Sequence, residues 1–133
     1  MKCSPDIITS LKPNEIFVFG SNLAGIHGAG AAKLASDRFG ARTGQGEGAA
    51  GQTYAIPTKD FDILTLPIEE VEYGVSRFIR WAKANPLVIC LVTEIGCGLA
   101  GYQPKDIAPL FFQHRIPENV LLPRRFEELR PPA

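Results

Sequence analysis

The stretch from Gly20 to Gly30 holds the first residues of the sequence that could bind a ligand. It follows the apolar run Ile16 to Phe19 and contains Gly20, Ser21, Asn22, Gly25, Gly28 and Gly30. Glycines let a ligand approach the main chain closely, and free N–H groups at the start of a following helix attract an anion. The same glycines also suit a tight strand-to-helix turn that only permits close packing. The stretch alone leaves both interpretations open.

His27 lies inside this stretch and is the first candidate for catalysis. An imidazole titrates near neutral pH, so it could act as an acid, as a base or as a contact to phosphate. The alternative is a loop imidazole that forms a local hydrogen bond and takes no part in chemistry.

A second glycine-rich stretch runs from Thr93 to Tyr102, after another apolar run. Its central residues are Gly96, Cys97, Gly98, Leu99, Ala100 and Gly101. Cys97 lies near an expected helix N-terminus, a setting that could lower the pKa of its thiol. We nevertheless expect Cys97 to shape the loop. Two glycine-rich loops that face one cleft are less expected by chance than one.

The elements that must position these loops alternate between strands and helices. We expect strands at 6–9, 16–19, 53–57, 87–93 and 119–123, and helices at 30–39, at 67–84 and after a cap at Asp106. The glycine-rich segment 40–52 has no period, which predicts a loop that is mobile or ordered only by a ligand.

This alternation predicts an α/β fold with three layers, α/β/α, around a central mixed, largely parallel sheet. Right-handed crossovers would bring both glycine-rich stretches to the same edge of that sheet. Thr58 and Lys59 follow the strand expected at 53–57 and would reach the same edge, where open α/β sheets place their ligands.

Composition narrows the classes of function. The chain has 133 residues, which predicts a single domain over 1–133, and its 14 basic residues balance 14 acidic ones. Net charge therefore gives no reason to expect a nucleic-acid polymer or an anionic membrane surface as partner. Without an apolar signal segment or a membrane-length run, a cytoplasmic location is expected. Three cysteines without CxxC spacing predict free thiols and no metal or cofactor.

Taken together, the motifs resemble the two ligand loops of macro domains. The resemblance rests on Gly20-Ser21-Asn22 with its Gly-x-Gly helix start and on Ile95 to Tyr102, and it spans most of the chain. Within that superfamily, Tyr-Ala-Ile-Pro-Thr-Lys at 54–59 and Ile-Gly-Cys-Gly-Leu at 95–99 are similar to the terminal ADP-ribose glycohydrolase branch and to ADP-ribose-1″-phosphatases. The resemblance implies a macro-domain-like fold that binds ADP-ribose or an ADP-ribosylated substrate.

The same resemblance implies positions for the parts of the ligand. Asn22 and the glycines after it would surround the distal ribose, and residues 96–102 would wrap the diphosphate with main-chain N–H groups. Asp6 would contact adenine. Gly20, Ser21 and Thr58 would complete the binding site.

Catalysis is where the sequence departs from the family. In the glycohydrolase branch, a lysine after the middle strand works with an aspartate directly after Gly-Cys-Gly-Leu. Lys59 matches the lysine, but Ala100 stands in place of the acid. We therefore expect His27 to matter more than Lys59 for turnover. In the alternative, Lys59 acts with an acid from elsewhere, such as Asp60 or Glu94, or is only a solvent-facing lysine.

Two functions follow from these expectations. One is a hydrolase that cleaves a 1″-phosphate, an ester or an ADP-ribosyl linkage at the distal ribose. The other is a non-catalytic module that reads or sequesters ADP-ribose or a related nucleotide. Both need the same pocket, and they differ in whether a catalytic group lies beside the scissile bond.

Overall fold

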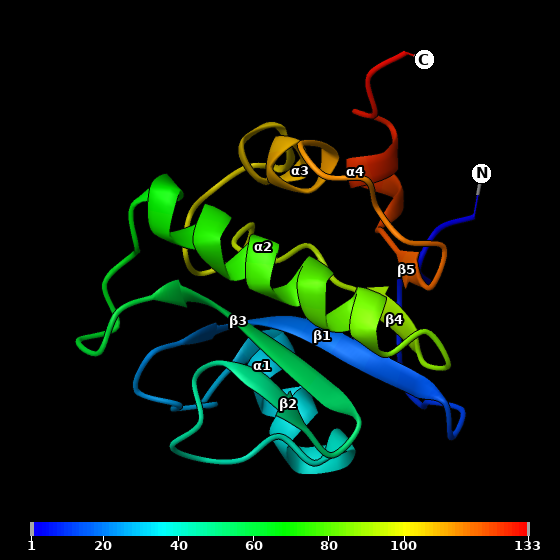
Figure 1. The fold of residues 1–133 in the computed structure, drawn as a ribbon. Coiled ribbons are helices and arrows are strands. Elements are labelled where there is room, and N and C mark those ends of the chain that lie inside the picture. The colour runs from blue at the N-terminus through cyan, green and yellow to red at the C-terminus, as the bar shows by residue number, and fades with distance from the viewer. Residues whose placement is uncertain (1, 133) are drawn as a thin grey trace.

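The fold is built on a five-stranded mixed sheet in the order β2-β3-β1-β4-β5. The structure, a computed structural model, describes residues 2–132. Its strands are β1 (Glu15–Asn22), β2 (Gly48–Ala50), β3 (Thr53–Lys59), β4 (Ile89–Val92) and β5 (Val120–Leu121). All neighbouring pairs are parallel except β2 with β3. The expected α/β fold with a mixed, largely parallel sheet is confirmed (Figure 1).

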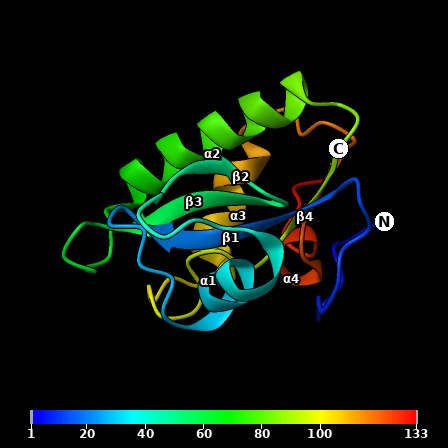
Figure 2. The ribbon, with the colours of Figure 1, turned by 90° about the horizontal axis from the view of Figure 1, so that it is seen from below.

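Helices cover both faces of this sheet because side chains of β1 alternate between two apolar clusters. Ile16 and Val18 face a cluster formed with α2 (Ile68–Ala84), α3 (Pro104–Phe112) and α4 (Arg124–Glu127). Phe17 and Phe19 face the opposite cluster, formed with α1 (Gly30–Leu34) and the π-helical segment η1 (Ala35–Phe39). Figure 2 shows the strands between α1 and α2.

The helix α2 is the element that the sequence predicts most closely. Val71, Val75 and Phe78 are fully buried, and they recur at the three- and four-residue spacing of one helix face. Acidic residues occupy its first turn and Lys83 its last, an order that suits the helix dipole. The helix begins one residue after the expected start at Pro67 and ends at Ala84 as expected.

Several predicted elements differ from the structure. No strand forms at 6–9, where the chain makes only an isolated bridge at Ser4. The helix α3 begins at Pro104, with Gln103 as N-cap and Asp106 at the third helical position of a capping box. Asp106 therefore stabilises this helix start from inside the first turn. The short helix α4 lies in a tail for which the sequence predicted no element.

The segment 40–52 is held by the protein itself, contrary to the expectation of a loop ordered only by ligand. The Gly44 N–H donates to the Gly25 carbonyl at 2.9 Å, and residues 48–50 form the edge strand β2. A Cβ atom at Gly46 would lie 2.3 Å from the Asn22 carbonyl oxygen, so the two loops touch main chain to main chain. Glycine at this position permits the contact.

The connections after β1 and β4 leave the sheet toward opposite faces. β1 leads to α1 on one face, whereas its neighbours β3 and β4 lead to α2 and α3 on the other. In open α/β sheets, a crevice forms outside the carboxyl ends of the strands where neighbouring connections diverge in this way. The fold therefore places a crevice above the C-terminal end of β1.

Candidate functional site

A pocket of about 520 Å³ occupies this crevice. Its volume lies in the range of roughly 300–1,000 Å³ that is typical of small-molecule sites. The predicted site residues that line it are Gly20, Ser21, Asn22, Gly28, Gly30, Thr58, Lys59, Gly96, Cys97, Gly98, Leu99 and Ala100. The structure thus brings both glycine-rich stretches to one pocket. The predicted residues that do not line it are Asp6, Gly25, His27, Gly101 and Tyr102.

The C-terminal end of β1 forms the floor of the pocket. Contrary to the expected turn at Gly20, the strand continues to Asn22, and its pairing with β3 shifts register after Ser21. Such an irregularity bends a strand locally. A Cβ atom at Gly20 would lie 3.3 Å from the Gly96 nitrogen, so glycine lets β1 and the second stretch meet closely at the floor.

Asn22 uses both ends of its amide to hold the first loop. Its Nδ2 donates to the Ile26 carbonyl at 2.8 Å, and its Oδ1 accepts from the Ile26 N–H at 3.0 Å. The side chain is buried, and these bonds fix the turn through which the chain passes from β1 toward α1. Asn22 therefore shapes the pocket wall as well as lining it.

His27 faces away from the pocket. Its Nε2 lies 2.9 Å from the Arg42 carbonyl oxygen and therefore donates to it, and its ring packs edge-on against Phe19 with centroids 5.4 Å apart. Phe19 belongs to the cluster beneath α1, so the imidazole closes that cluster. The buried Nδ1 has no partner among residues 2–132. This placement matches the locally bonded imidazole and does not favour the catalytic role expected for His27.

The second stretch wraps the pocket on the β4 side. Gly96 has a φ of 73°, where an L side chain would be strained, and a Cβ there would lie 3.1 Å from Ile107 of α3. Burial, with a smaller effect of Glu94, raises the pKa of Cys97 to about 11. The thiol is therefore neutral at physiological pH, which agrees with the expectation that Cys97 shapes the loop. Its Sγ donates to the Ile95 carbonyl at 3.4 Å.

A hairpin turn after β3, residues 60–66, borders the pocket on its other side, and we call it the β3 lip. Asp60 Oδ1 accepts from the N–H groups of Asp62 and Leu64 at 2.8 and 3.0 Å, which holds the turn. Ile63 of the β3 lip lines the pocket, although its φ of 64° is unfavourable for a β-branched residue. The Asp60 carboxylate thus stabilises the lip and does not line the pocket.

Two hydrogen bonds join the β3 lip to the second stretch. Thr65 Oγ1 donates to the Ala100 carbonyl at 2.8 Å, and the Tyr102 hydroxyl donates to the Leu66 carbonyl at 2.6 Å. Tyr102 therefore acts on the pocket through the lip instead of lining it. Burial, followed by Glu69 and Asp106, raises the pKa of Tyr102, so the hydroxyl stays a donor at neutral pH.

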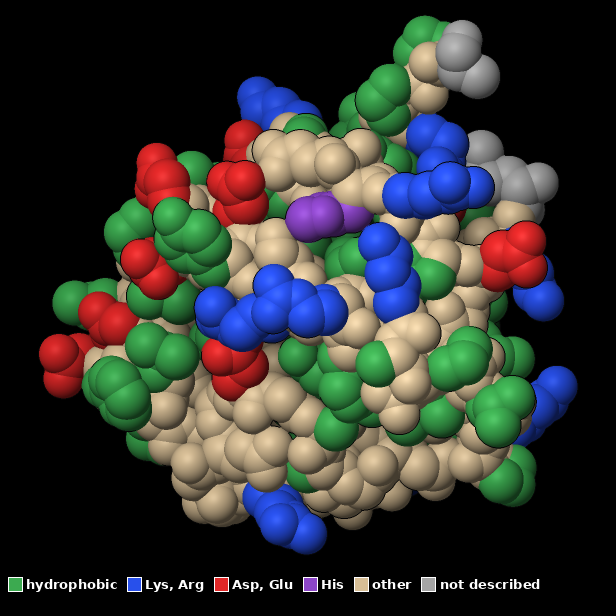
Figure 3. All heavy atoms as spheres, viewed as in Figure 1, with side chains coloured by type: hydrophobic (Ala, Val, Ile, Leu, Met, Phe, Trp, Pro, Cys, Tyr) green, Lys and Arg blue, Asp and Glu red, His purple; other side chains and the backbone are tan. Residues whose placement is uncertain are grey.

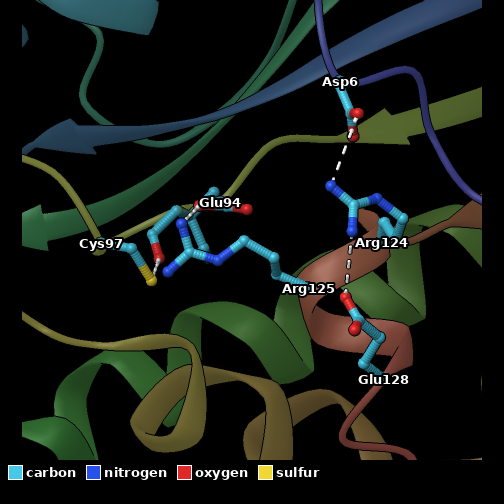
Figure 4. A network of polar contacts seen from close by, with 7 residues as sticks. Asp6, Glu94, Cys97, Arg124, Arg125 and Glu128 are labelled. Atoms are coloured by element: carbon cyan, nitrogen blue, oxygen red, sulfur yellow. Dashed lines mark hydrogen bonds and ion pairs between the residues drawn. The ribbon is translucent and has the colours of Figure 1, made fainter.

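Lys59 and Glu94 are the two charged residues among those that line the pocket. Lys59 ends β3, and its carbonyl accepts from the Leu23 N–H at 2.9 Å. Glu94 follows β4, and its Oε1 lies 3.4 Å from Nη1 of Arg125 in α4, as Figure 4 shows. These two residues therefore line the pocket from the ends of the strands on either side of β1.

Asp6 does not reach the pocket. Its side chain is exposed and lies 3.7 Å from Nη2 of Arg124, within the group of ion pairs drawn in Figure 4. The structure therefore does not place Asp6 where the adenine contact was expected. Its partner Arg124 comes from α4, an element that the sequence did not predict.

Ile26 and Ile63 are among the apolar pocket residues that sequence reasoning missed. Ile26 lay inside the first glycine-rich stretch and could have been included because of its position. Ile63 gave no signal, since its place at the pocket depends on the hairpin bridge between Lys59 and Thr65 and on its positive φ.

Within residues 2–132, no group of three or more histidine, cysteine or acidic side chains could hold a metal ion. Across the same residues, no helix combines the length and the apolar character needed to cross a membrane. No family model, curated protein or solved structure matches the chain.

Proposed function

We propose that the protein binds ADP-ribose or a derivative in the pocket above β1 and hydrolyses a bond at the distal ribose. The observation that carries the proposal is the convergence of both glycine-rich stretches on one pocket of about 520 Å³. This is the arrangement that the resemblance to macro domains implies for a ligand with a diphosphate between two riboses. The macro-domain assignment itself is part of the proposal.

The character of the pocket wall supports a ligand held largely by the main chain. Gly28, Gly30 and Gly98 line the pocket, and a Cβ atom at any of them would meet no neighbour within 4 Å. The backbone at these positions is therefore open to the pocket. A diphosphate bound by N–H groups needs no arginine, and no arginine lines the pocket among residues 2–132.

Hydrolysis needs groups that move protons beside the scissile bond, and Lys59 and Glu94 are the candidates that line the pocket. Water adds to C1″ of the distal ribose and gives its proton to the Glu94 carboxylate, in place of the acid missing at Ala100. The bond between C1″ and the substituent breaks, and the leaving substituent takes a proton from the Lys59 side chain. A positioned acid or base contributes typically about 10²–10⁴ in rate.

The second candidate function is a module that binds ADP-ribose without hydrolysing it. The ion pair between Glu94 and Arg125 favours this alternative, because the carboxylate is already engaged by a guanidinium. Both candidates predict the same binding, so turnover decides between them.

Calorimetric titration with free ADP-ribose tests the binding that both candidates share. We expect saturable binding with a moderate dependence on salt, because main-chain dipoles and few net charges hold the ligand. Absence of heat and of competition by any ADP-ribose derivative would reject both candidates. Product formation with a panel of 1″-substituted derivatives, compared between the parent and Lys59→Ala, separates the hydrolase from the binding module.

A further inference from the structure

Three apolar side chains border the pocket from three different loops. Ile26 follows β1, Ile63 lies in the β3 lip and Leu99 belongs to the second stretch. Their exposed fractions are 55%, 39% and 74%, so all three offer hydrocarbon surface to solvent. We call these three side chains the apolar rim. Aliphatic side chains at the mouth of a pocket are suited to contact an apolar part of the ligand.

Ile63 is the residue of the apolar rim whose backbone conformation is strained. It is the one non-glycine residue with a positive φ among residues 2–132. Glycine or asparagine would adopt this backbone conformation with little strain, whereas a β-branched residue is strained there. Strain of this kind is concentrated at ligand sites, which points to a function for the side chain itself.

The surroundings of Ile63 are hydrophobic and acidic. Asp60 and Asp62 flank it in the lip, and Phe61 and Leu64 are exposed at 70% and 64%. Figure 3 shows hydrophobic and acidic side chains gathered at the left edge of the molecule, where Figure 1 places the end of β3. A phosphate at this position would face the hydrocarbon of Ile63, with Lys59 as the neighbouring cation, and the two carboxylates of the lip do not line the pocket.

Ile63 also lies on the Lys59 side of the pocket, where the departure of the substituent was assigned. Lys59 and Thr65 pair across the base of the same hairpin, so the lip extends directly from the lysine. Glu94 and Arg125 lie on the other side of β1. A substituent on C1″ of a ribose beside Lys59 would therefore extend toward the apolar rim.

We propose that the substituent on the distal ribose is an uncharged, apolar group, such as an aryl ring, that packs on Ile26, Ile63 and Leu99. This inference rests on the proposed function and narrows its substrate class. Derivatives with a neutral leaving group are the substrates, and ADP-ribose-1″-phosphate is not. The bond that breaks and the water that adds are those given above, so no further reactant is needed.

The test compares four ligands that differ only at C1″: ADP-ribose, its 1″-phosphate, its 1″-O-methyl derivative and its 1″-O-phenyl derivative. Affinities are measured by competition against labelled ADP-ribose. The assay is run at low temperature, so that each measurement is complete before the ligand is hydrolysed. We expect the phenyl derivative to bind about tenfold more tightly than the 1″-phosphate, because burying one face of the ring removes apolar surface from water.

Variants connect this preference to the rim. Ile63→Asn keeps a side chain that tolerates the positive φ but is polar. We expect it to reduce the preference for the phenyl derivative over the 1″-phosphate to less than about threefold, while the melting temperature is not lowered. Leu64→Ser is the matched control, because Leu64 is exposed in the same turn but does not line the pocket. It should retain the full preference.

Each outcome decides the inference. The inference is overturned if the 1″-phosphate binds as tightly as the phenyl derivative or more tightly. It is also overturned if Ile63→Asn prefers the phenyl derivative as strongly as the parent does. In both cases, binding of ADP-ribose itself leaves the proposed function standing. Failure of all four ligands to bind would overturn both together. Loss of ADP-ribose binding in Leu64→Ser would show that the lip acts only through its fold, and would also overturn the inference.

Discussion

Lys59 and His27 lie in different surroundings, although Lys59 ends β3, His27 follows β1, and both strands end at the pocket. Lys59 lines the pocket, whereas the His27 ring packs on Phe19 and donates to the Arg42 carbonyl. If the protein is a hydrolase, we expect Lys59→Ala to lower kcat by about 10²-fold or more. His27→Ala should change kcat less than about threefold. It should instead lower the free energy of unfolding by about 1–2 kcal/mol, through the lost hydrogen bond and packing.

Steady-state kinetics and chemical denaturation of the two variants measure these effects separately. Full turnover in Lys59→Ala, together with loss of turnover in a stably folded His27→Ala, would restore the catalytic role that the sequence suggested for His27. Lys59→Arg serves as a further control, because it keeps the positive charge but does not release a proton near neutral pH.

Gly98 offers a clean test of the binding surface at the level of a single residue. An added Cβ would meet nothing within 4 Å, and Gly98 has no positive φ. Gly98→Val should therefore fold with an unfolding free energy within about 0.5 kcal/mol of the parent. We expect it to lose ADP-ribose binding by more than about tenfold, since the side chain would occupy the ligand's path. Gly98→Ala should show a smaller loss.

Denaturation curves and calorimetry provide both measurements. ADP-ribose binding by Gly98→Val at the parental affinity would show that the second stretch does not hold the ligand. Gly30 is less suitable for this comparison because its φ of 59° would add backbone strain to any steric effect.

At the scale of elements, the β3 lip and the second stretch form one unit joined by two side-chain hydrogen bonds. Tyr102→Phe removes the hydroxyl that donates to the Leu66 carbonyl, and Thr65→Val removes the donor to Ala100. Each change should cost about 1 kcal/mol of stability. We expect each to weaken ADP-ribose binding several-fold, because two walls of the pocket lose their mutual support.

The measurement is a double-mutant cycle on the ADP-ribose dissociation constant. If the lip and the stretch act as a unit, the double variant should lose less than the sum of the single losses. Strict additivity would mean that the two bonds support the pocket independently. Gln113→Ala, at the exposed C-cap position after α3 and outside the pocket, is a suitable control.

The elements that the sequence predicted are those with a strong period. Repeated apolar spacing defined α2, and continuous apolar runs located β1 and β4. The start of α3 was misplaced because aspartate is favoured both at the N-cap and at the third helical position, and Asp106 occupies the latter. The four residues of α4 are too few to show a period.

For the candidate site, the sequence predicted the features that follow from the order of strands and helices. Parallel strand topology brings strand ends to one edge, so the meeting of both glycine-rich stretches followed from the order of elements. The direction of the His27 ring and the place of Ile63 did not follow. They depend on the contact with Arg42 and on a hairpin turn with positive φ, which are tertiary features without a local pattern.

At the scale of the whole molecule, two buried groups and one partly buried group with raised pKa values make stability depend on alkaline pH. Burial raises the pKa of Cys90 to about 12 and that of Cys97 to about 11, and burial together with Glu47 raises the pKa of Tyr54 to about 12. In the unfolded chain these groups ionise first, the thiols near pH 9. Above that pH the folded state binds more protons than the unfolded state, so stability falls as pH rises.

We therefore expect the free energy of unfolding to fall by about 1–3 kcal/mol between about pH 9 and about pH 11, with little change between about pH 7 and about pH 8. Urea denaturation across this range measures the decline. Cys90→Ala lowers stability at every pH by leaving a small cavity, but it removes one titrating group and should make the alkaline decline shallower. An equally steep decline in Cys90→Ala would show that the buried thiol of β4 does not set the alkaline limit.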